Sequence, residues 1–188
     1  MSQLLAHRLG TTAHLSPLVH KAERLGMRMP EDLERLALAR GLRYFGQLSQ
    51  TANDDLNEGS RSLPSPDQFS NEELAIALMS PTLPYSLNRL RMAAAMLGAH
   101  GSSAEIILRL SQLERCENIV HHIAECASHV EPGHPLWQTL LHGLSAQPSP
   151  PPDILPHPSR FVAMSGLDRT GRNTKSQWIR PHDPKQSG

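Results

Sequence analysis

The stretch SNEELAIALMSPTLPYSLNRLRMAAAMLG, residues 70–98, decides the fold class of this sequence. It begins with a capping box, in which Ser70 and Glu73 each accept a backbone N–H that the first helical turn leaves free. The apolar run after the box ends before Pro81, which has no N–H to donate and cannot continue a helix. A second cap at Ser86 precedes an apolar stripe with helical spacing, formed by Leu87, Leu90, Ala94 and Leu97. The stretch therefore predicts two short, capped helices.

Two further capping boxes follow this stretch. Ser102 lies three residues before Glu105, and Ser111 lies three residues before Glu114. These pairs predict two consecutive helices with a bend near Ser111. A last amphipathic helix is expected over 134–144, where one face presents Leu136, Trp137, Leu140 and Leu141. No part of the sequence alternates between apolar and polar residues for long enough to predict a strand.

A helix pair is expected before the central stretch. Ser16 and Pro17 form a cap followed by proline at the first helical position, where the missing N–H costs no hydrogen bond. Gly26 ends this helix, and the acidic residues after Pro30 lie at the positive end of the next helix dipole. The apolar residues available for packing are Leu18, Val19, Ala22, Leu25, Leu33, Leu36, Ala37, Leu42 and Phe45. The pattern does not determine whether the pair docks on the central helices.

Composition divides the chain into four segments. They are an N-terminal helix pair over 1–50, a turn-rich linker over 51–68, a helical core over 69–144, and a basic tail over 145–188 that holds half of the 16 prolines. Such a proline-rich segment is expected to be extended or disordered. The sequence thus predicts an all-α fold: a compact array of five or six short antiparallel helices, packed as a bundle or as a HEAT-like superhelix, with the N-terminal pair and a disordered tail.

Composition also excludes several classes of protein. The 188 residues carry 18 basic and 18 acidic side chains, so the balance does not indicate a nucleic-acid binder along the whole chain. Two cysteines are too few for a disulfide scaffold. No window approaches the roughly 20 apolar residues that span a bilayer, and the N-terminus lacks the pattern of a secretory signal. We therefore expect a cytoplasmic protein with no membrane partner.

The most chemically suggestive segment is ERCENIVHHIAECASHV, residues 114–130. On one continuous helix, Leu113 and Cys116 belong to an apolar face with Cys126 at its margin, whereas Glu114 belongs to the opposite, polar face. Ten helical residues separate the two thiols by about 15 Å along the helix axis, too far for a disulfide. The two cysteines are therefore predicted to be buried, unbridged side chains.

The polar face of that helix carries four ligand-type residues one turn apart: Glu117, His121, Glu125 and His129. They form the candidate site of a metal-dependent enzyme only if a second helix adds ligands. The alternative is a solvated face, in which neighbouring Glu and protonated His side chains attract each other weakly. We favour the solvated face, and the sequence predicts no metal and no cofactor.

A nucleic-acid role is a second alternative. A comparison of the N-terminal pair with helix–turn–helix modules fails at Asp32 and Arg35, which fall where those modules bury apolar residues. The basic residues that would contact phosphates are Arg24, Arg28, Arg40, Arg43, Arg169, Arg172 and Lys175. Because acidic residues interrupt this set, the nucleic-acid role ranks behind the leading hypothesis.

The leading hypothesis is a non-catalytic helical module for protein–protein association or scaffolding. Its expected anchors are Trp137, Phe161 and Trp178, since aromatic side chains dominate the energy of protein interfaces. A sequence that ends like a phosphate loop at Lys175 lacks the glycine before the lysine, because Thr174 stands there. The sequence leaves the enzyme question open but favours a non-enzyme, and it leaves the partner as an unknown protein or a second copy.

Overall fold

The computed structural model describes residues 3–44, 68–145, 150, 154–155 and 178–181. Nearly all of the predicted linker and most of the predicted tail lie outside these residues. The described part is all-helical, as predicted, apart from one antiparallel pair of two-residue strands. Its elements are α1 (Leu5–Arg8), α2 (Pro17–Arg24), α3 (Glu31–Ala39), β1 (Arg43–Tyr44), α4 (Asn71–Leu78), α5 (Leu87–Leu97), α6 (Ala104–Leu113), α7 (Glu117–Val130), α8 (Pro135–Gly143) and β2 (Trp178–Ile179).

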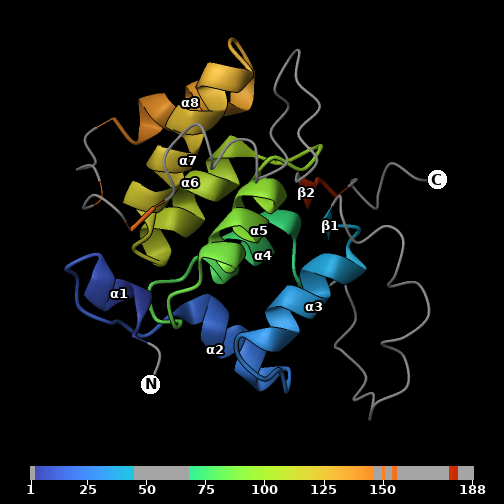
Figure 1. Ribbon diagram of the computed structural model, residues 1–188, viewed down its shortest axis with the longest axis vertical. Helices are drawn as coiled ribbons and strands as arrows, with labels where there is room; N and C mark the ends of the chain where they lie inside the picture. Colours follow the sequence, from blue (N-terminus) through green and yellow to red (C-terminus); the bar gives the residue numbers. More distant parts are fainter. Residues whose placement is uncertain (1–2, 45–67, 146–149, 151–153, 156–177, 182–188) are drawn as a thin grey trace.

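Helix α4 lies at the centre of the molecule and packs along α5 (Figure 1). Its predicted capping box is present: the Glu73 N–H donates to Ser70 Oγ, and the Ser70 N–H donates to the Glu73 carboxylate. After the first turn, every side chain from Leu74 to Ala77 is 0% exposed. A helix that is apolar on all sides can only be stable when other helices surround it. Helix α4 therefore organises the rest of the fold.

The turn between α4 and α5 also holds the start of the chain. The Leu5 N–H donates to the Leu83 carbonyl at 2.9 Å, and the Tyr85 N–H donates to the Gln3 carbonyl at 2.8 Å. The predicted cap of α5 is confirmed, since Ser86 Oγ accepts the N–H of the third helical residue. These hydrogen bonds fix α1 against the end of the central helix pair.

The N-terminal pair α2–α3 docks on the central helices, which answers the question that the sequence left open. Helix α2 contacts α4, and α3 contacts both α4 and α5. Leu33 and Leu36 are 0% exposed and belong to the same hydrophobic cluster as α4. At the edge of this contact, Lys21 Nζ lies 2.8 Å from the Glu73 carboxylate, and Arg89 Nε lies 3.0 Å from Glu34 Oε1. The pair and the central helices therefore share one core.

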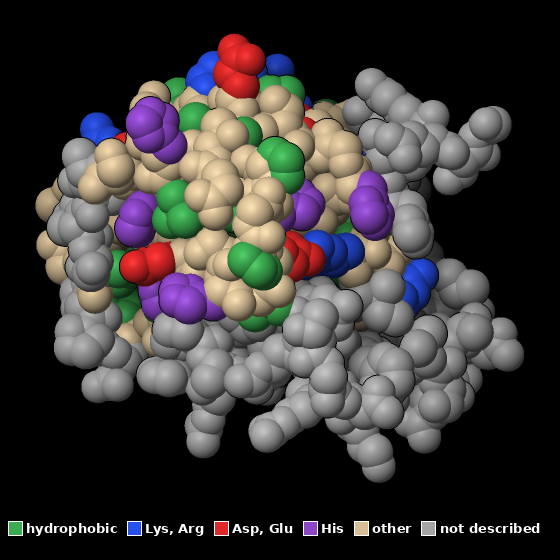
Figure 2. All heavy atoms as spheres, turned by 90° about the horizontal axis from the view of Figure 1, so that it is seen from above, with side chains coloured by type: hydrophobic (Ala, Val, Ile, Leu, Met, Phe, Trp, Pro, Cys, Tyr) green, Lys and Arg blue, Asp and Glu red, His purple; other side chains and the backbone are tan. Residues whose placement is uncertain are grey.

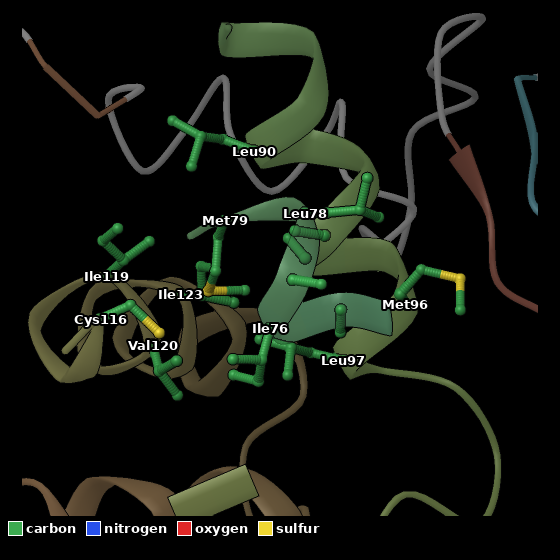
Figure 3. Close-up of a cluster of buried hydrophobic side chains, with 14 of the residues drawn as sticks. Ile76, Leu78, Met79, Leu90, Met96, Leu97, Cys116, Ile119, Val120 and Ile123 are labelled. Atoms are coloured by element: carbon green, nitrogen blue, oxygen red, sulfur yellow. The ribbon is translucent and has the colours of Figure 1, made fainter. Parts of the chain in front are cut away.

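Helices α6, α7 and α8 cover the other side of α4 (Figure 1). In Figure 3, the side chains of Cys116, Ile119, Val120 and Ile123 lie beside those of Ile76 and Met79. The predicted apolar face of α8 is confirmed, with Trp137 and Leu140 at 0% exposure. Burial of this kind of apolar surface contributes about 25 cal/mol per Å² and is the main force that holds the layers together.

The start of α6 differs by one residue from the prediction. Ser103, and not Ser102, is the N-cap, and its Oγ accepts the Ile106 N–H. Two adjacent serines offer the same side-chain chemistry, so the local pattern does not decide between them. The predicted box at Ser111 is wrong: the Ser111 hydroxyl donates to the Leu108 carbonyl inside α6.

The segment 114–130 is not one continuous helix, which corrects a central expectation. Helix α6 ends at Leu113, α7 begins at Glu117, and Arg115 between them has a left-handed φ of 53°. The break rotates α6 relative to α7, so Leu113 is 50% exposed while Glu114 is 0% exposed, the reverse of the predicted faces. Both cysteines are buried and unbridged, as predicted.

No helix in the described part of the chain is long and apolar enough to cross a membrane.

Candidate functional site

A short segment near the C-terminus of the chain packs against the helical core. We call residues 178–181 the C-terminal strap. Its strand β2 pairs antiparallel with β1, so that Ile179 lies opposite Arg43 and Trp178 lies opposite Tyr44. Strand β2 also contacts α5, and Figure 1 shows the strap beside the end of α3 and the central helices. A segment from the predicted tail is therefore docked on the surface of the core.

Arg180 fixes the strap to the junction between α7 and α8. Its Nη1 lies 2.9 Å from Glu131 Oε1, and the two side chains are only 15% and 19% exposed. Its aliphatic stem and Nε lie against Gly98, the C-cap residue of α5, where a Cβ atom would come within 2.8 Å of Nε. Gly98 thus leaves the space that the guanidinium occupies. We call Gly98, Glu131 and strand β1 together the Arg180 site.

Glu131 joins the strap to the core of α8. Its second carboxylate oxygen accepts the indole N–H of the buried Trp137 at 2.6 Å. Burial works against the charged form, but the hydrogen bonds from Arg180 and Trp137, with the charge of Arg180, lower the pKa of Glu131 below its ordinary value. The carboxylate is therefore ionised at neutral pH and holds the arginine by a charge-assisted hydrogen bond.

The Arg180 site offers hydrogen-bond acceptors to only part of the Arg180 guanidinium. Among the described residues, Nε and Nη2 of Arg180 are buried without a hydrogen-bond partner. Each buried donor that lacks an acceptor costs free energy, which offsets part of the gain from the ion pair. The arrangement thus places an extended backbone beside β1 and the Arg180 guanidinium beside the Glu131 carboxylate.

A second carboxylate, that of Glu114, lies just before the N-terminal end of α7 and holds other parts of the fold together. Glu114 is buried beneath the N-terminus of α2, where the Leu18 N–H donates to its Oε1 at 2.7 Å. The hydroxyls of Ser16 and Ser80 donate to its other oxygen. We call Glu114, Ser16, Ser80 and the Leu18 N–H the Glu114 cluster. All three donors point at a carboxylate that accepts only, so the cluster is satisfied and holds α2, α4 and α6 together.

The two thiols do not offer a nucleophile. Burial, reinforced by the charges of Glu114 and Glu117, raises the pKa of Cys116 well above its ordinary value. Burial and the charge of Glu125 raise the pKa of Cys126 to about 12. Because only the thiolate is reactive, both cysteines act as small packing side chains at neutral pH.

The four residues of the alternative metal site are not brought together into a ligand set. Within the described ranges, no group of three or more His, Cys, Asp or Glu side chains could hold an ion. His129 Nδ1 instead lies 2.7 Å from the backbone carbonyl of Glu125, and both residues are exposed. Figure 2 shows histidines at several separate places on the upper face of the molecule. Glu117 and His121 are partly exposed on α7.

Of the three predicted partner anchors, one is buried, one lies outside the described residues and one belongs to a strand. Trp137 is 0% exposed, so it packs in the core, and its role as a partner anchor stays a prediction that our proposal does not use. Phe161 lies outside the described residues. Trp178 belongs to strand β2 through its backbone. Of the three predicted anchors, Trp178 is the one that lies in the strap, on which our proposal rests.

The basic residues of the nucleic-acid alternative that the structure describes do not share one role. Arg40 donates to Asn71 Oδ1 and to the Phe69 carbonyl, and Arg43 donates to backbone carbonyls at the end of α3. Arg24 and Arg28 are exposed on the N-terminal pair. The remaining three residues of that set, Arg169, Arg172 and Lys175, lie outside the part of the chain that is described.

Sequence reasoning did not find the Arg180 site. Glu131 sits in a turn after the last periodic residue of α7, and Gly98 is expected to end a helix, with no sign that it also receives a side chain. Arg180 is one of several basic residues in a proline-rich segment. The only local signal is the run of apolar residues followed by arginine, Trp178-Ile179-Arg180, inside a polar tail.

Comparison with known protein families, with curated proteins and with solved structures finds no match for this chain.

Proposed function

We propose that the chain is a non-catalytic helical module for protein–protein association, and that it binds an extended segment on the surface of its helical core. A cytoplasmic location, expected from the sequence, is part of this proposal. The observation that supports it is the strap: the core already holds an extended segment through backbone pairing with β1 and through the Arg180–Glu131 ion pair. Adding a strand at an exposed edge is a common way to recognise peptides.

The use of the polar side chains also favours this proposal. Glu114 and Glu131 are occupied in holding segments together, and the thiols have raised pKa values. These two carboxylates and two thiols, among the residues that the structure describes, are thus engaged in packing or in hydrogen bonds of the fold. A surface that binds an extended chain needs only accessible backbone groups and a few well-placed side chains.

The test is binding of the strap supplied as a separate peptide. A labelled peptide spanning residues 174–184 is titrated with the full chain carrying Arg180→Glu, whose own strap is repelled by Glu131. We expect saturable binding, measured by fluorescence anisotropy, that changes little between low and moderate salt because it rests on backbone pairing and on one ion pair that is mostly shielded from solvent. Unchanged far-UV circular dichroism and melting temperature establish that the variant is folded.

A labelled DNA duplex serves as the rival probe in the same titration. Binding of the duplex that falls steeply with salt, together with no binding of the peptide, would replace our proposal with the nucleic-acid alternative. No binding of the peptide up to millimolar protein would also overturn the proposal. A scrambled peptide of the same composition is the matched control for nonspecific association.

A further inference from the structure

Helices α7 and α8, with the turn between them, carry no lysine and no arginine. Over residues 117–143 the acidic side chains are Glu117, Glu125 and Glu131, and the histidines are His121, His122, His129, His134 and His142. Histidine is the side chain whose ordinary charge change falls between pH 5 and 8. The charge of this segment therefore rises from −3 toward +2 as the pH falls through that range. Figure 2 looks onto the α8 side of the molecule, and histidine side chains are spread over this face.

His134 belongs to the same tight turn as Glu131. The His134 N–H donates to the Glu131 carbonyl at 3.2 Å, and the His134 side chain is exposed. Its ring centroid lies 6.0 Å from that of Trp137, whose indole N–H donates to the Glu131 carboxylate. The charge of His134 also contributes to the lowered pKa of Glu131. A protonated His134 is therefore a second cation beside the carboxylate that holds Arg180.

The other charged groups around the turn are permanent charges or histidines at other places. His129 Nδ1 lies 2.7 Å from the Glu125 carbonyl, so this ring is held one turn back along α7. His100 is exposed two residues after Gly98, on the α5 side of the site. The elements packed against α7, α8 and the strap also carry permanent charges, among them Arg43, Arg91, Glu105, Arg109 and Arg115. Guanidinium and carboxylate groups ordinarily keep their charge between pH 5 and 8, so the response in this range comes from the histidines.

We infer that the closing of the strap is pH-sensitive, because protonation of His134 places a second positive charge beside Glu131 and weakens the hold on Arg180 as the pH falls from about 7.5 to about 5.5. In the closed strap, Arg180 and a protonated His134 share one carboxylate and repel each other. In the open strap, only the attraction between His134 and Glu131 remains, so the protonated form favours opening. The inference names the regulation of the surface in the proposed function, and it rests on that function only for its use in binding.

The expected effect is a loosening and not a release. The Arg180 and Glu131 side chains are mostly buried, so salt screens charges at this pair less than it screens charges on an open surface. Two like charges roughly 8 Å apart near a protein surface change an equilibrium by about threefold. Glu131 keeps its own charge in this range because its pKa is lowered. The histidine step is therefore separate from the loss of the ion pair when Glu131 itself is protonated.

The test is hydrogen exchange at residues 178–180 of the full chain, measured at pH 7.5 and at pH 5.5. Division by the intrinsic exchange rate at each pH gives the opening constant of the strap. We expect this constant to rise about threefold in the wild type at the lower pH. His134→Gln, which stays neutral, should abolish the rise, and His134→Lys, which stays charged, should show the higher constant at both pH values. Exchange in α4 should be unaffected.

Two histidine variants serve as matched controls. His142→Gln changes an exposed histidine of α8 that lies eight residues beyond His134, about 12 Å along the helix. This separation exceeds the Debye length of about 8 Å at physiological salt, so the threefold rise should remain. His100→Gln should also keep most of the rise. A rise that is lost in His100→Gln and kept in His134→Gln would overturn the assignment to His134.

The remaining outcomes separate this inference from the proposed function. An opening constant that is equal at both pH values in the wild type, or a His134→Lys variant that matches the wild type at pH 7.5, would overturn the inference and leave the binding of the peptide untouched. Absence of peptide binding together with a strap that opens more at pH 5.5 through His134 would overturn the proposed function and support the inference.

Discussion

Two glutamates flank helix α7, and they differ in what they hold. Glu114 precedes the helix, is 0% exposed, and accepts hydrogen bonds from two serine hydroxyls and one backbone N–H. Glu131 follows the helix, has a side chain that is 19% exposed, and pairs with Arg180 and Trp137. The first joins helices that belong to the core. The second joins the core to a segment at its surface.

The difference between these two sites shows that a glutamate can hold core helices together or can hold a segment at the surface, depending on its burial. A fully buried carboxylate with neutral donors has no water to replace a lost partner, so its cluster opens only when the protein unfolds. A carboxylate that keeps part of its surface exposed can exchange its cation for water at a smaller cost than a fully buried one. We therefore expect mutations at Glu114 to change global stability, and mutations at Glu131 to change the strap.

The largest effect is expected for Glu114→Ala. The substitution leaves the Leu18 N–H and the hydroxyls of Ser16 and Ser80 buried without their acceptor, which should lower the free energy of unfolding by about 3 kcal/mol or more. Urea denaturation measures this change. Glu125→Ala removes an exposed carboxylate of the same helix region and should change stability by less than about 0.5 kcal/mol. A loss at Glu114 no greater than that of the control would contradict the assigned role.

Glu131→Gln should have a smaller and more local effect. The amide oxygen can still accept the Trp137 indole N–H, but the charge that attracts Arg180 is gone. We expect a loss of about 1–2 kcal/mol in the closing of the strap, seen as roughly tenfold faster hydrogen exchange at residues 178–180. Exchange in α4 should stay unchanged. Equal acceleration in both places would show that Glu131 supports the whole core and not the strap.

Gly98→Ala should disturb the strap with almost no effect on the core. Its φ of −79° is open to alanine, but the new Cβ would come within 2.8 Å of Arg180 Nε. The flexible end of the arginine must move, so the strap should exchange hydrogen faster while the melting temperature stays nearly constant. An unchanged strap would mean that the guanidinium does not depend on the space beside Gly98.

Acid should release the strap at a pH below the ordinary pKa of a glutamate side chain. The pKa of Glu131 lies below its ordinary value, so the carboxylate stabilises the folded form above a pH of about 4.3 and loses this contribution as the pH falls through the lower, folded value. The Trp137 indole N–H resonance should shift in that range, because its acceptor is the titrating group. Glu131→Gln should abolish the shift, and a shift that persists in this variant would assign it to another group.

The sequence predicts the elements whose signals are local. The capping box of α4, the caps at Ser16 and Ser86 and the buried face of α8 each depend on residues within one or two turns of each other. Helix existence and the all-α class follow from these local signals. The docking of α2–α3 does not, because an apolar stripe indicates that a face is buried without indicating against what.

The errors occur where a distant partner outweighs the local pattern. Ser111 and Glu114 have the spacing of a capping box, yet the carboxylate hydrogen-bonds with Ser16 and Ser80, which are 98 and 34 residues away in the chain. The Arg180–Glu131 pair is equally nonlocal, and no periodic pattern contains either residue. The alternative functions and the boundaries of the four predicted segments stay predictions.

The most direct test of our central claim is a charge-reversal cycle read by hydrogen exchange at residues 178–180 of the full chain. Arg180→Glu and Glu131→Arg should each accelerate exchange there, because each places like charges together in the Arg180 site. The double variant restores an opposite pair, and we predict that it returns exchange most of the way to the wild-type rate. Exchange in the double variant as fast as in either single variant, or single variants that match the wild type, would contradict the claim.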